Sequence, residues 1–352
     1  MAEVIPLPVG HMKTSVVFAV PDFLPIVELS QQAEALGYDR VWTTETPGRD
    51  ALIRAVTIAL RTRTIEVATG IAYAFTRAPL AMAASAADAY VAAGGRFSLG
   101  IGAGTQGMRS RWYGIEDFDR PATRLGEYAQ ALRQAWNSTQ EFSFAGDFYR
   151  GRAAPLDGAR PAVPLWGSGL NRVMLTVAAR HFDGVAVHAL AAAHPYFDAV
   201  VMPALRDGRA GQDSALSIAV WQMTSADDDA EQARQRGRRA LAFYFSTPSY
   251  GSVAEATGWS DVAERIRTGY RESGPRWDDL GALIPEDMLD EFCLVGTPGE
   301  LRERWPDVQR HYAERGATEL VLQALVGDLA DRDSYDSTVR LLDTFAPHSS
   351  GG

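Results

Sequence analysis

Cysteine and lysine are almost absent from this chain of 352 residues. Cys293 is its one cysteine, which excludes an internal disulfide and a cysteine-based metal cluster and fits a reducing, cytoplasmic environment. Lys13 is its one lysine. Because no lysine falls within an expected strand, the sequence excludes an aldolase or isomerase that forms a Schiff base there.

Long apolar runs and a basic surface are missing as well. No run reaches the roughly 18 residues of a membrane span. Residues 1–13 lack a basic region followed by an apolar core, so no secretory signal is expected. The net charge of −10 argues against a nucleic-acid partner. Residues 1–13 are expected to be a flexible lead-in, and residues 347–352 a disordered tail.

Two kinds of catalytic motif are also missing. The histidines lack a ligand-like spacing with carboxylates, so no metal site is expected. No G-x-S-x-G nucleophile elbow occurs, which argues against an esterase. The patterns that are present must therefore indicate the function.

The chain alternates short apolar segments with helical patterns. Near-continuous apolar segments are typical of parallel strands that are covered on both faces. Eight strand–helix units predict a (β/α)8 barrel, a single domain over residues 14–346, with a hairpin and loop inserted near 140–162 and extra helices near 240–293. The expected strands are 14–20, 40–45, 65–72, 96–102, 163–168, 183–189, 216–224 and 318–325.

The stretch RFSLGIGAGTQ, residues 96–106, places three glycines at the end of an expected strand. A dinucleotide fingerprint needs G-x-G-x-x-G at the opening of a helix. Here the spacing is G-x-G-x-G, and the residues that follow form a poor helix start, so we disfavour a Rossmann site. On a barrel strand such glycines let backbone and loop pack closely, at the end where barrels bind ligands.

Four segments in order carry a family resemblance: GYDRVWTTET, VATGIAYAFTRAPLAMA, GGRFSLGIGAGTQ and VGTPGELRER. They resemble the luciferase-like monooxygenase superfamily, above all its branch of oxidoreductases that use the deazaflavin coenzyme F420. The resemblance covers about residues 14–346. It implies the same barrel, with a flavin or deazaflavin ring held at the C-terminal ends of the strands.

The resemblance also implies how the cofactor is held. A non-prolyl cis peptide at the end of strand three would match Gly70–Ile71 and back the ring, whereas an ordinary strand-ending glycine is the alternative. The cofactor phosphate would bind at the N-terminus of the helix after strand five, where free N–H groups attract an anion. A simple loop and helix cap is the alternative there. The matching residues are Gly169, Leu170, Asn171 and Arg172.

Two positions depart from the pattern of the deazaflavin relatives. Glu45 keeps the acidic residue expected beside the ring, but Thr46 stands where many relatives have histidine. Thr105, followed by Gln106, stands where a relative has a catalytic glutamate. The side chains of Thr105 and Gln106 can hydrogen-bond a cofactor ring or a substrate carbonyl but cannot relay protons at neutral pH. Glu45 is expected to contact the cofactor and to act in catalysis, with a surface pair to Arg49 as the alternative.

Further polar and aromatic residues end strands and are expected at the mouth of the barrel. His188 is a candidate catalytic residue because its ordinary pKa suits proton transfer, although a lone histidine is commonly structural. Tyr73, Trp221 and Gln222 are candidates for the substrate pocket. Aromatic residues such as Tyr73 can equally belong to the core.

These patterns predict an enzyme that transfers a hydride between F420 and a small organic substrate. A monooxygenase with the same fold that uses FMN is the alternative. A cofactor-binding protein without turnover is a further alternative, suggested by the missing histidine and by Thr105. The resemblance allows a homodimer, although no interface patch stands out.

Overall fold

The computed structural model describes residues 12–19, 22–117, 119–156, 162–325 and 332–347. The predicted lead-in and tail therefore lie largely outside the described residues. Lys13 is the first residue of β1, so the expectation that no strand contains a lysine is wrong. Its Nζ lies 2.7 Å from Glu66 Oε1 at the N-terminal end of the barrel. No lysine therefore reaches the mouth from a described strand.

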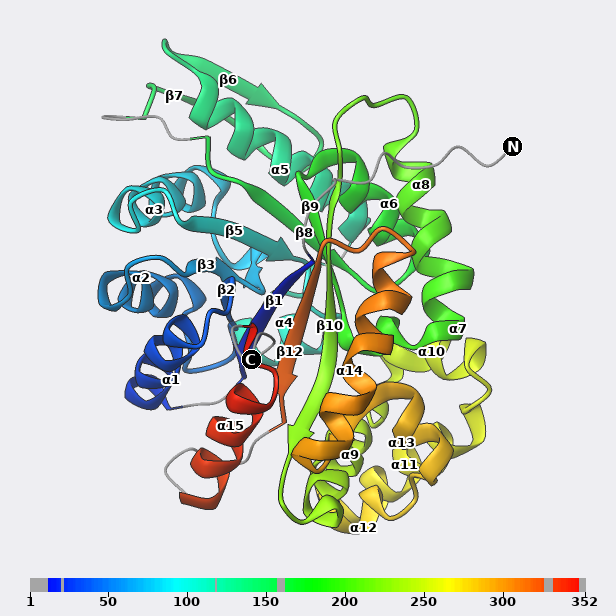
Figure 1. Cartoon of the computed structure of the whole chain (residues 1–352). Coiled ribbons are helices and arrows are strands. Elements are labelled where there is room, and N and C mark those ends of the chain that lie inside the picture. Colours follow the sequence, from blue (N-terminus) through cyan, green and yellow to red (C-terminus); the bar gives the residue numbers. More distant parts are fainter. Residues whose placement is uncertain (1–11, 20–21, 118, 157–161, 326–331, 348–352) are drawn as a thin grey trace.

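Eight parallel strands close into a barrel, which confirms the predicted fold (Figure 1). The ring closes where β12 returns to β1, with Lys13 opposite Glu319 and Phe18 opposite Ala324. In order around the barrel the strands are β1 (Lys13–Phe18), β2 (Arg40–Thr43), β3 (Glu66–Thr69), β5 (Phe97–Gly102), β8 (Leu165–Gly169), β9 (Gly184–Val187), β10 (Ser217–Ala226) and β12 (Glu319–Ala324).

Two short strands extend this ring without closing it. β4 (Ala72–Tyr73) follows β3 and pairs with the end of β5. β11 (Cys293–Gly296) pairs with the C-terminal part of β10, beyond the residues that β9 covers. Both lie toward the C-terminal ends of the strands and therefore help to shape the mouth.

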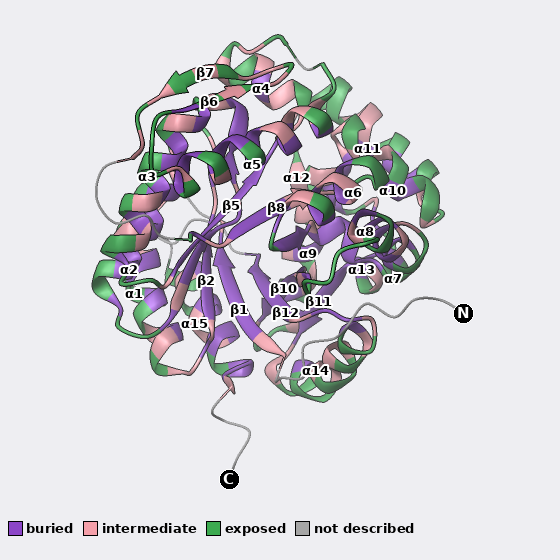
Figure 2. Ribbon diagram, turned by 90° about the horizontal axis from the view of Figure 1, so that it is seen from above, coloured by how far each residue is buried: buried purple, intermediate pink, exposed green. Residues whose placement is uncertain are grey.

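Helices surround the barrel, and Figure 2 shows buried strands inside a ring of helices whose outer faces are exposed. Local capping sets several starts: Asp50 accepts the N–H of Ile53 at 2.9 Å, and Thr297 and Glu300 form the expected capping box. No helix in the described part of the chain has the length and apolarity needed to cross a membrane. The helices are α1 (Phe23–Ala35), α2 (Ala51–Arg61), α3 (Pro79–Ala92), α4 (Gln106–Tyr113), α5 (Pro121–Asn137), α6 (Arg172–His181), α7 (His194–Tyr196), α8 (Met202–Arg209), α9 (Ala230–Phe245), α14 (Pro298–Ala313) and α15 (Arg332–Thr344), with the 3-10 helices η1 (Ala74–Thr76), η2 (Ala189–Ala192) and η4 (Pro248–Tyr250) and the π-helix η3 (Phe197–Val201).

The two predicted insertions contain the expected kinds of structure. β6 (Phe142–Ala145) and β7 (Arg150–Ala153) form an antiparallel hairpin. Its loop is anchored by Glu127 of α5, whose carboxylate accepts backbone N–H groups from residues 147–149. Four helices follow α9, on the side of the molecule where β10 ends in Figure 1. They are α10 (Gly251–Ala256), α11 (Ser260–Ser273), α12 (Trp277–Gly281) and α13 (Glu286–Phe292).

Side chains that alternate along the strands fill the inside of the barrel. The interior cluster consists of Val17, Trp42, Ala68, Trp166, Ala186, Ala219 and Val321, with Trp221 packed against it. Trp42 meets Trp166 edge-on at 5.3 Å and Trp221 at 6.1 Å between ring centroids. A column of three indoles therefore runs through the barrel from its base to its mouth.

An ion-pair network closes the base of this column. Arg40 donates to Glu319 at 2.5 Å and to Glu66, and its guanidinium lies 5.2 Å from the ring centre of Trp42. Trp42 Nε1 donates to the other oxygen of Glu319 at 2.7 Å. These groups are compensated by one another, as buried charges must be.

Candidate functional site

The glycines of residues 96–106 lie where β5 passes the end of β3. A Cβ on Gly100 would stand 2.0 Å from Thr69 O, and one on Gly102 would stand 2.3 Å from Ile71 Cδ1. The glycines therefore let residues 69–71 pack directly against β5, which is a structural task and not dinucleotide binding. The peptide bond between Gly70 and Ile71 is cis, as the resemblance implies.

A helix does begin directly after these glycines, so the expectation of a poor helix start is wrong. Thr105 is the N-cap of α4, and its Oγ1 accepts the N–H of Met108 at 3.2 Å. Gln106 is the first residue of that helix and is exposed. The capping role accounts for a threonine at position 105 without any cofactor.

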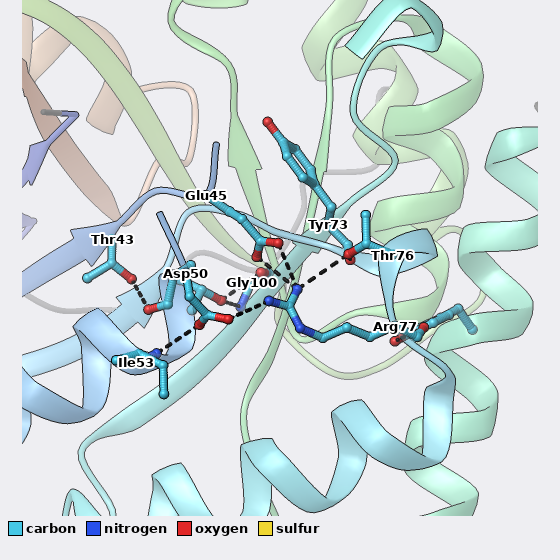
Figure 3. A network of polar contacts seen from close by, with 11 residues as sticks. Thr43, Glu45, Asp50, Ile53, Tyr73, Thr76, Arg77 and Gly100 are labelled. Atoms are coloured by element: carbon cyan, nitrogen blue, oxygen red, sulfur yellow. Dashed lines mark hydrogen bonds and ion pairs between the residues drawn. The ribbon is translucent and has the colours of Figure 1, made fainter. Parts of the chain in front are cut away.

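Glu45 is held by an ion-pair network on the β2–β3 side of the mouth (Figure 3). Arg77 Nη1 donates to both carboxylate oxygens of Glu45, at 2.8 and 3.0 Å, and its Nη2 donates to Asp50 at 2.7 Å. The alternative prediction, a surface ion pair between Glu45 and Arg49, is therefore wrong. Burial raises the pKa of the Glu45 carboxyl, although the Arg77 guanidinium acts in the opposite direction. In Figure 3 the side chain of Tyr73 points away from this network.

Three buried polar atoms at the mouth have no hydrogen-bond partner among the described residues. They are Thr44 Oγ1, Thr46 Oγ1 and Trp221 Nε1. Thr44 continues the inward-facing set of β2 after Arg40 and Trp42, since side chains alternate along a strand. An unpartnered buried polar atom is costly, so atoms of this kind mark a place where a ligand or water belongs.

His188 follows β9 and is the N-cap of η2. Its Nδ1 accepts the N–H of Leu190 at 3.2 Å, so a neutral ring carries its hydrogen on Nε2. The ring stacks on Tyr250 and meets Tyr244 edge-on, each at 5.2 Å between centroids. Burial lowers the pKa of His188 to about 4. The expectation of an ordinary pKa suited to proton transfer near pH 7 is therefore wrong.

The two other candidates for the substrate pocket lie differently. Tyr73 is buried, and its ring meets Tyr113 edge-on at 5.8 Å. Gln222 follows the inward-facing Trp221 in β10 and therefore faces outward, and its Nε2 donates to Phe292 O at 3.1 Å. The interpretation of Gln222 as a substrate residue is therefore wrong, because its side chain is committed outside the mouth.

The start of α6 is a helix cap beside a cavity. Asn171 is the N-cap, and its Oδ1 accepts the N–H of Met174 at 2.9 Å. Arg172 donates to Asp207 at 2.5 Å, and both side chains are exposed. A cavity of about 320 Å³ lies between the starts of α5 and α6, lined by Arg120 among others. Arg120 and not Arg172 lines this cavity, and Arg120 is itself paired with Asp119 at 3.2 Å and with Asp147 at 3.1 Å.

Close packing explains the first two residues of the same segment. A Cβ on Gly169 would stand 2.9 Å from Met174 Cγ and 3.1 Å from Leu175 N, so the end of β8 touches the first turn of α6. Leu170 O accepts the hydroxyl hydrogen of Tyr196 at 3.2 Å. These contacts fix the backbone of the turn that the resemblance assigns to the phosphate.

The chain is similar to proteins of one known family. A family model described as luciferase-like monooxygenase matches residues 7–319. The chain belongs to the luciferase-like monooxygenase family. The 5,10-methylenetetrahydromethanopterin reductase of Methanolobus tindarius is 26% identical over 308 residues, which cover 86% of this chain and 91% of that protein.

Solved structures with the same fold include two that differ in their cofactor. The coenzyme F420 dependent tetrahydromethanopterin reductase from Methanopyrus kandleri matches with a TM-score of 0.80 at 21% identity, over 96% of this chain and 99% of that chain. The oxygenating constituent of 3,6-diketocamphane monooxygenase from Pseudomonas putida, in complex with FMN, matches with a TM-score of 0.68 at 17% identity, over 96% and 98%. At these identities the matches show the fold alone.

Sequence reasoning missed three residues of this luciferase-like mouth: Thr44, Arg77 and Arg120. The alternation of β2 could have identified Thr44, because Arg40 and Trp42 share its face. Arg120 precedes Pro121 at a helix start, which is a signal that the sequence offers. Arg77 carries no local signal, because its partner Glu45 lies 32 residues away.

Proposed function

We propose that this protein is an F420-dependent oxidoreductase that transfers a hydride between the deazaflavin and a small organic substrate. The observation that carries the proposal is the pair of unpartnered hydroxyl oxygens of Thr44 and Thr46 at the mouth. A planar heterocycle with carbonyl and N–H edges suits such a set. The family membership and the F420-dependent reductase of the same fold support the same choice.

The residues present fit a ring at this position. The Thr44 and Thr46 hydroxyls would hydrogen-bond its polar edge, and Gly70 and Ile71 would form the wall behind its face. Glu45 would border the ring, held in one orientation by Arg77. Charge on Glu45 is partly balanced there, so the carboxylate can stay in place without a mobile counter-ion.

The phosphate of the cofactor would bind at the start of α6. Residues 169–172 supply the turn, and the cavity beside it places Arg120 on the opposite wall. Backbone N–H groups at a helix start attract anions, and an arginine strengthens such a site. Since Asn171 already caps one N–H group, the remaining N–H groups would carry the binding. Arg120 would add charge by exchanging Asp119 or Asp147 for the phosphate.

When bound, the deazaflavin supplies the hydride chemistry, and the protein supplies position and exclusion of water. Thr105 and Gln106 stay proposed contacts of the cofactor, although Thr105 also caps a helix. Because His188 is held neutral, it is a poor source of protons at pH 7. The proton for a reduced substrate would therefore come from water or from a hydroxyl group at the mouth.

Titration with F420 and with FMN, followed by quenching of tryptophan fluorescence, tests the proposal. Trp221 lies at the mouth with Trp42 packed beneath it, so tryptophan fluorescence should report a bound ring. F420 should bind at micromolar concentration and FMN more weakly. Failure of both cofactors to bind at such concentrations would contradict the proposal.

An FMN-dependent monooxygenase is the second candidate, favoured by the match to a solved monooxygenase in complex with FMN. Oxygen consumption with reduced FMN, against the absorbance change of reduced F420, separates the two. Tight binding of F420 without turnover over a broad substrate panel would instead indicate a binding protein. The cap role of Thr105 and the neutral state of His188 are the observations that favour this hypothesis of a binding protein without turnover.

A further inference from the structure

His188 and Trp221 come to the mouth on neighbouring strands and on the same face. In the parallel register of β9 and β10, Ala186 lies opposite Ala219 and Val187 lies opposite Val220. Ala186 and Ala219 both belong to the interior cluster. The next inward positions are therefore His188 and Trp221, side by side where the strands open.

The His188 ring is oriented by its own turn and by two tyrosines. Nδ1 accepts from the backbone N–H of Leu190, which leaves the hydrogen on Nε2. Tyr250 covers one face of the ring, and Tyr244 meets it edge-on. These tyrosines are the titratable groups in ring contact with it, and burial raises the pKa of both hydroxyls, so they are uncharged at neutral pH. Within the described residues Nε2 has no protein acceptor.

The Trp221 ring is fixed as firmly. A Cβ on Gly70 would stand 2.4 Å from Trp221 Cζ2, so the backbone of Gly70 lies directly on the indole. Trp42 supports the ring from below. The Nε1 hydrogen is buried and has no acceptor among the described residues.

A third hydrogen is available beside these two. Gln323 Nε2 donates to the Tyr244 hydroxyl oxygen at 2.8 Å, which leaves that hydroxyl's own hydrogen for another acceptor. The groups on this side of the mouth are thus neutral donors on aromatic walls. The described charged groups Glu45, Arg77 and Asp50 lie on the β2–β3 side and are paired with one another.

We propose that His188 and Trp221 form a substrate subsite in which both donate hydrogen bonds to the acceptor atom of an uncharged, flat carbonyl or imine compound. The proposal rests on the proposed function, because it assigns the substrate side of the same mouth. A carboxylate or phosphate is disfavoured, since these neutral walls offer no compensating charge. The subsite thereby sets the substrate class by chemistry and not by size.

The same donors serve the reaction of such a substrate. When a hydride reaches the carbonyl carbon, the π electron pair moves to the oxygen, and the two N–H groups hold the charge that develops there. Water then supplies the proton that turns the oxygen into a hydroxyl. Neither His188 nor Trp221 gives up its own proton, so His188 acts as a neutral donor and not as a general acid.

Three probes of similar shape test the subsite on 15N-labelled protein, with and without F420. Acetophenone carries a neutral acceptor, ethylbenzene carries none, and benzoate carries a charged one. Binding is followed by the resonances of the Trp221 indole N–H and the His188 ring nitrogens. Acetophenone should bind about tenfold more tightly than ethylbenzene, because it gains hydrogen bonds that the hydrocarbon cannot make. Benzoate should bind more weakly than acetophenone.

Variants show whether these two donors cause the preference. Trp221→Phe and His188→Phe should each reduce the preference for acetophenone several-fold, whereas His188→Gln keeps an N–H donor and should retain it. Trp136→Phe is the control, since it removes an indole N–H that is bonded to Ala83 O at 3.0 Å, away from the mouth. That variant should leave the preference unchanged.

Several results would overturn the subsite. Benzoate binding as tightly as acetophenone would overturn it, and so would a preference for acetophenone that survives in both Trp221→Phe and His188→Phe. Displacement of acetophenone by F420, with F420 itself shifting the Trp221 resonance, would assign the donors to the cofactor instead. If F420 fails to bind while the preference persists, the proposed function fails and the subsite stands. If F420 binds and no preference exists, the subsite alone fails.

Discussion

The two ends of the barrel treat their polar groups in opposite ways. At the N-terminal end, both terminal nitrogens of Arg40 are paired with carboxylates, and Trp42 donates to Glu319. At the C-terminal mouth, the polar atoms of Thr44, Thr46 and Trp221 have no partner in the described part of the chain. Strand β2 leads to both ends, so the position of a polar group along the strand, and not the strand it belongs to, decides whether it is paired.

This difference shows that unpartnered buried polar atoms identify a ligand site better than the volume of a cavity does. A cavity of about 380 Å³ lies at the base, lined by Arg40, Glu66 and Trp166 among others. Its charged groups already compensate one another, although Arg40 Nε and Ser15 Oγ have no partner among the described residues. The balanced charges at the base stabilise the fold, whereas the unpartnered donors and acceptors at the mouth are available to a ligand.

The largest loss of stability is expected at the N-terminal end of the barrel, where the charged groups are paired. Arg40→Ala leaves the carboxylate of Glu319, which is almost fully buried, without its cation. Removing one partner of a buried ion pair costs about 3–5 kcal/mol. Urea denaturation should show a loss of that size in the free energy of unfolding, while cofactor binding per folded molecule stays the same.

Lys13→Met is the matched control at the same end. Lys13 is about one-third exposed and pairs with a similarly exposed Glu66, so its loss should cost less than about 1 kcal/mol. A loss for Arg40→Ala no larger than for Lys13→Met would break the comparison, because the base would then not depend on its pairing.

A smaller effect is expected where backbone meets indole at the mouth. Gly70→Ala would place a Cβ 2.4 Å from Trp221 Cζ2 and 2.8 Å from Trp42 Cε3. Overpacking of this kind costs about 1–3 kcal/mol, and the displaced Trp221 should weaken cofactor binding as well. Thermal denaturation and fluorescence titration measure the two effects.

Gly251→Ala provides the control for that substitution. A Cβ at Gly251 would meet nothing within 4 Å, and the residue begins α10. Its stability should change by less than about 1 kcal/mol, with cofactor binding unaltered. Equal changes in stability and in cofactor binding for the two substitutions would show that the contact between Gly70 and Trp221 contributes to neither.

The fold could be predicted from the sequence because each strand and helix carries its own signal. Apolar segments of the right length, with helix starts such as Pro298 after Thr297, identify every unit of the barrel without knowledge of its neighbours. The glycines at residues 96–106 were correctly assigned to close packing, although the helix that follows them was not expected.

The site could be predicted only in part, because its properties depend on distant partners. Glu45 was placed at the mouth, but its partner Arg77 comes from another loop, and no spacing rule connects the two. The pKa of His188 depends on burial by Tyr244 and Tyr250, which belong to a later insertion. Gln222 was assigned by strand position alone, and the alternation of β10 directs it outward.

A pH-dependent effect should separate His188 from an ordinary histidine. Its folded pKa is about 4 against 6.5 as the ordinary value, so between these values the unfolded state binds more protons. Stability from this group is complete above about pH 6.5 and is lost as the pH falls toward 4. Unfolding measured from pH 4.5 to 8 should therefore show a shallower acid loss in His188→Gln than in the unaltered protein.

Other groups contribute to the same profile, so the difference between proteins is the quantity to measure. Burial lowers the pKa of His311 to about 4 as well, and it raises the pKa of Glu45, which acts with the opposite sign. His311→Gln should remove a comparable part of the acid loss without affecting the mouth. Identical profiles for His188→Gln and the unaltered protein would mean that His188 titrates normally.

The smallest effect on stability, and the sharpest test of the comparison, comes from two threonines three residues apart. Thr43 Oγ1 donates to Ala51 O at 2.8 Å, whereas Thr46 Oγ1 has no partner within the described structure. Thr43→Val should therefore cost about 1 kcal/mol of stability and leave cofactor affinity unchanged. Thr46→Val should cost nothing or stabilise slightly, since it removes a buried group that is unsatisfied, yet it should weaken F420 binding about five- to tenfold. The reverse assignment, with Thr46→Val destabilising and F420 affinity preserved, would mean that the mouth resembles the base and holds its polar groups for the fold.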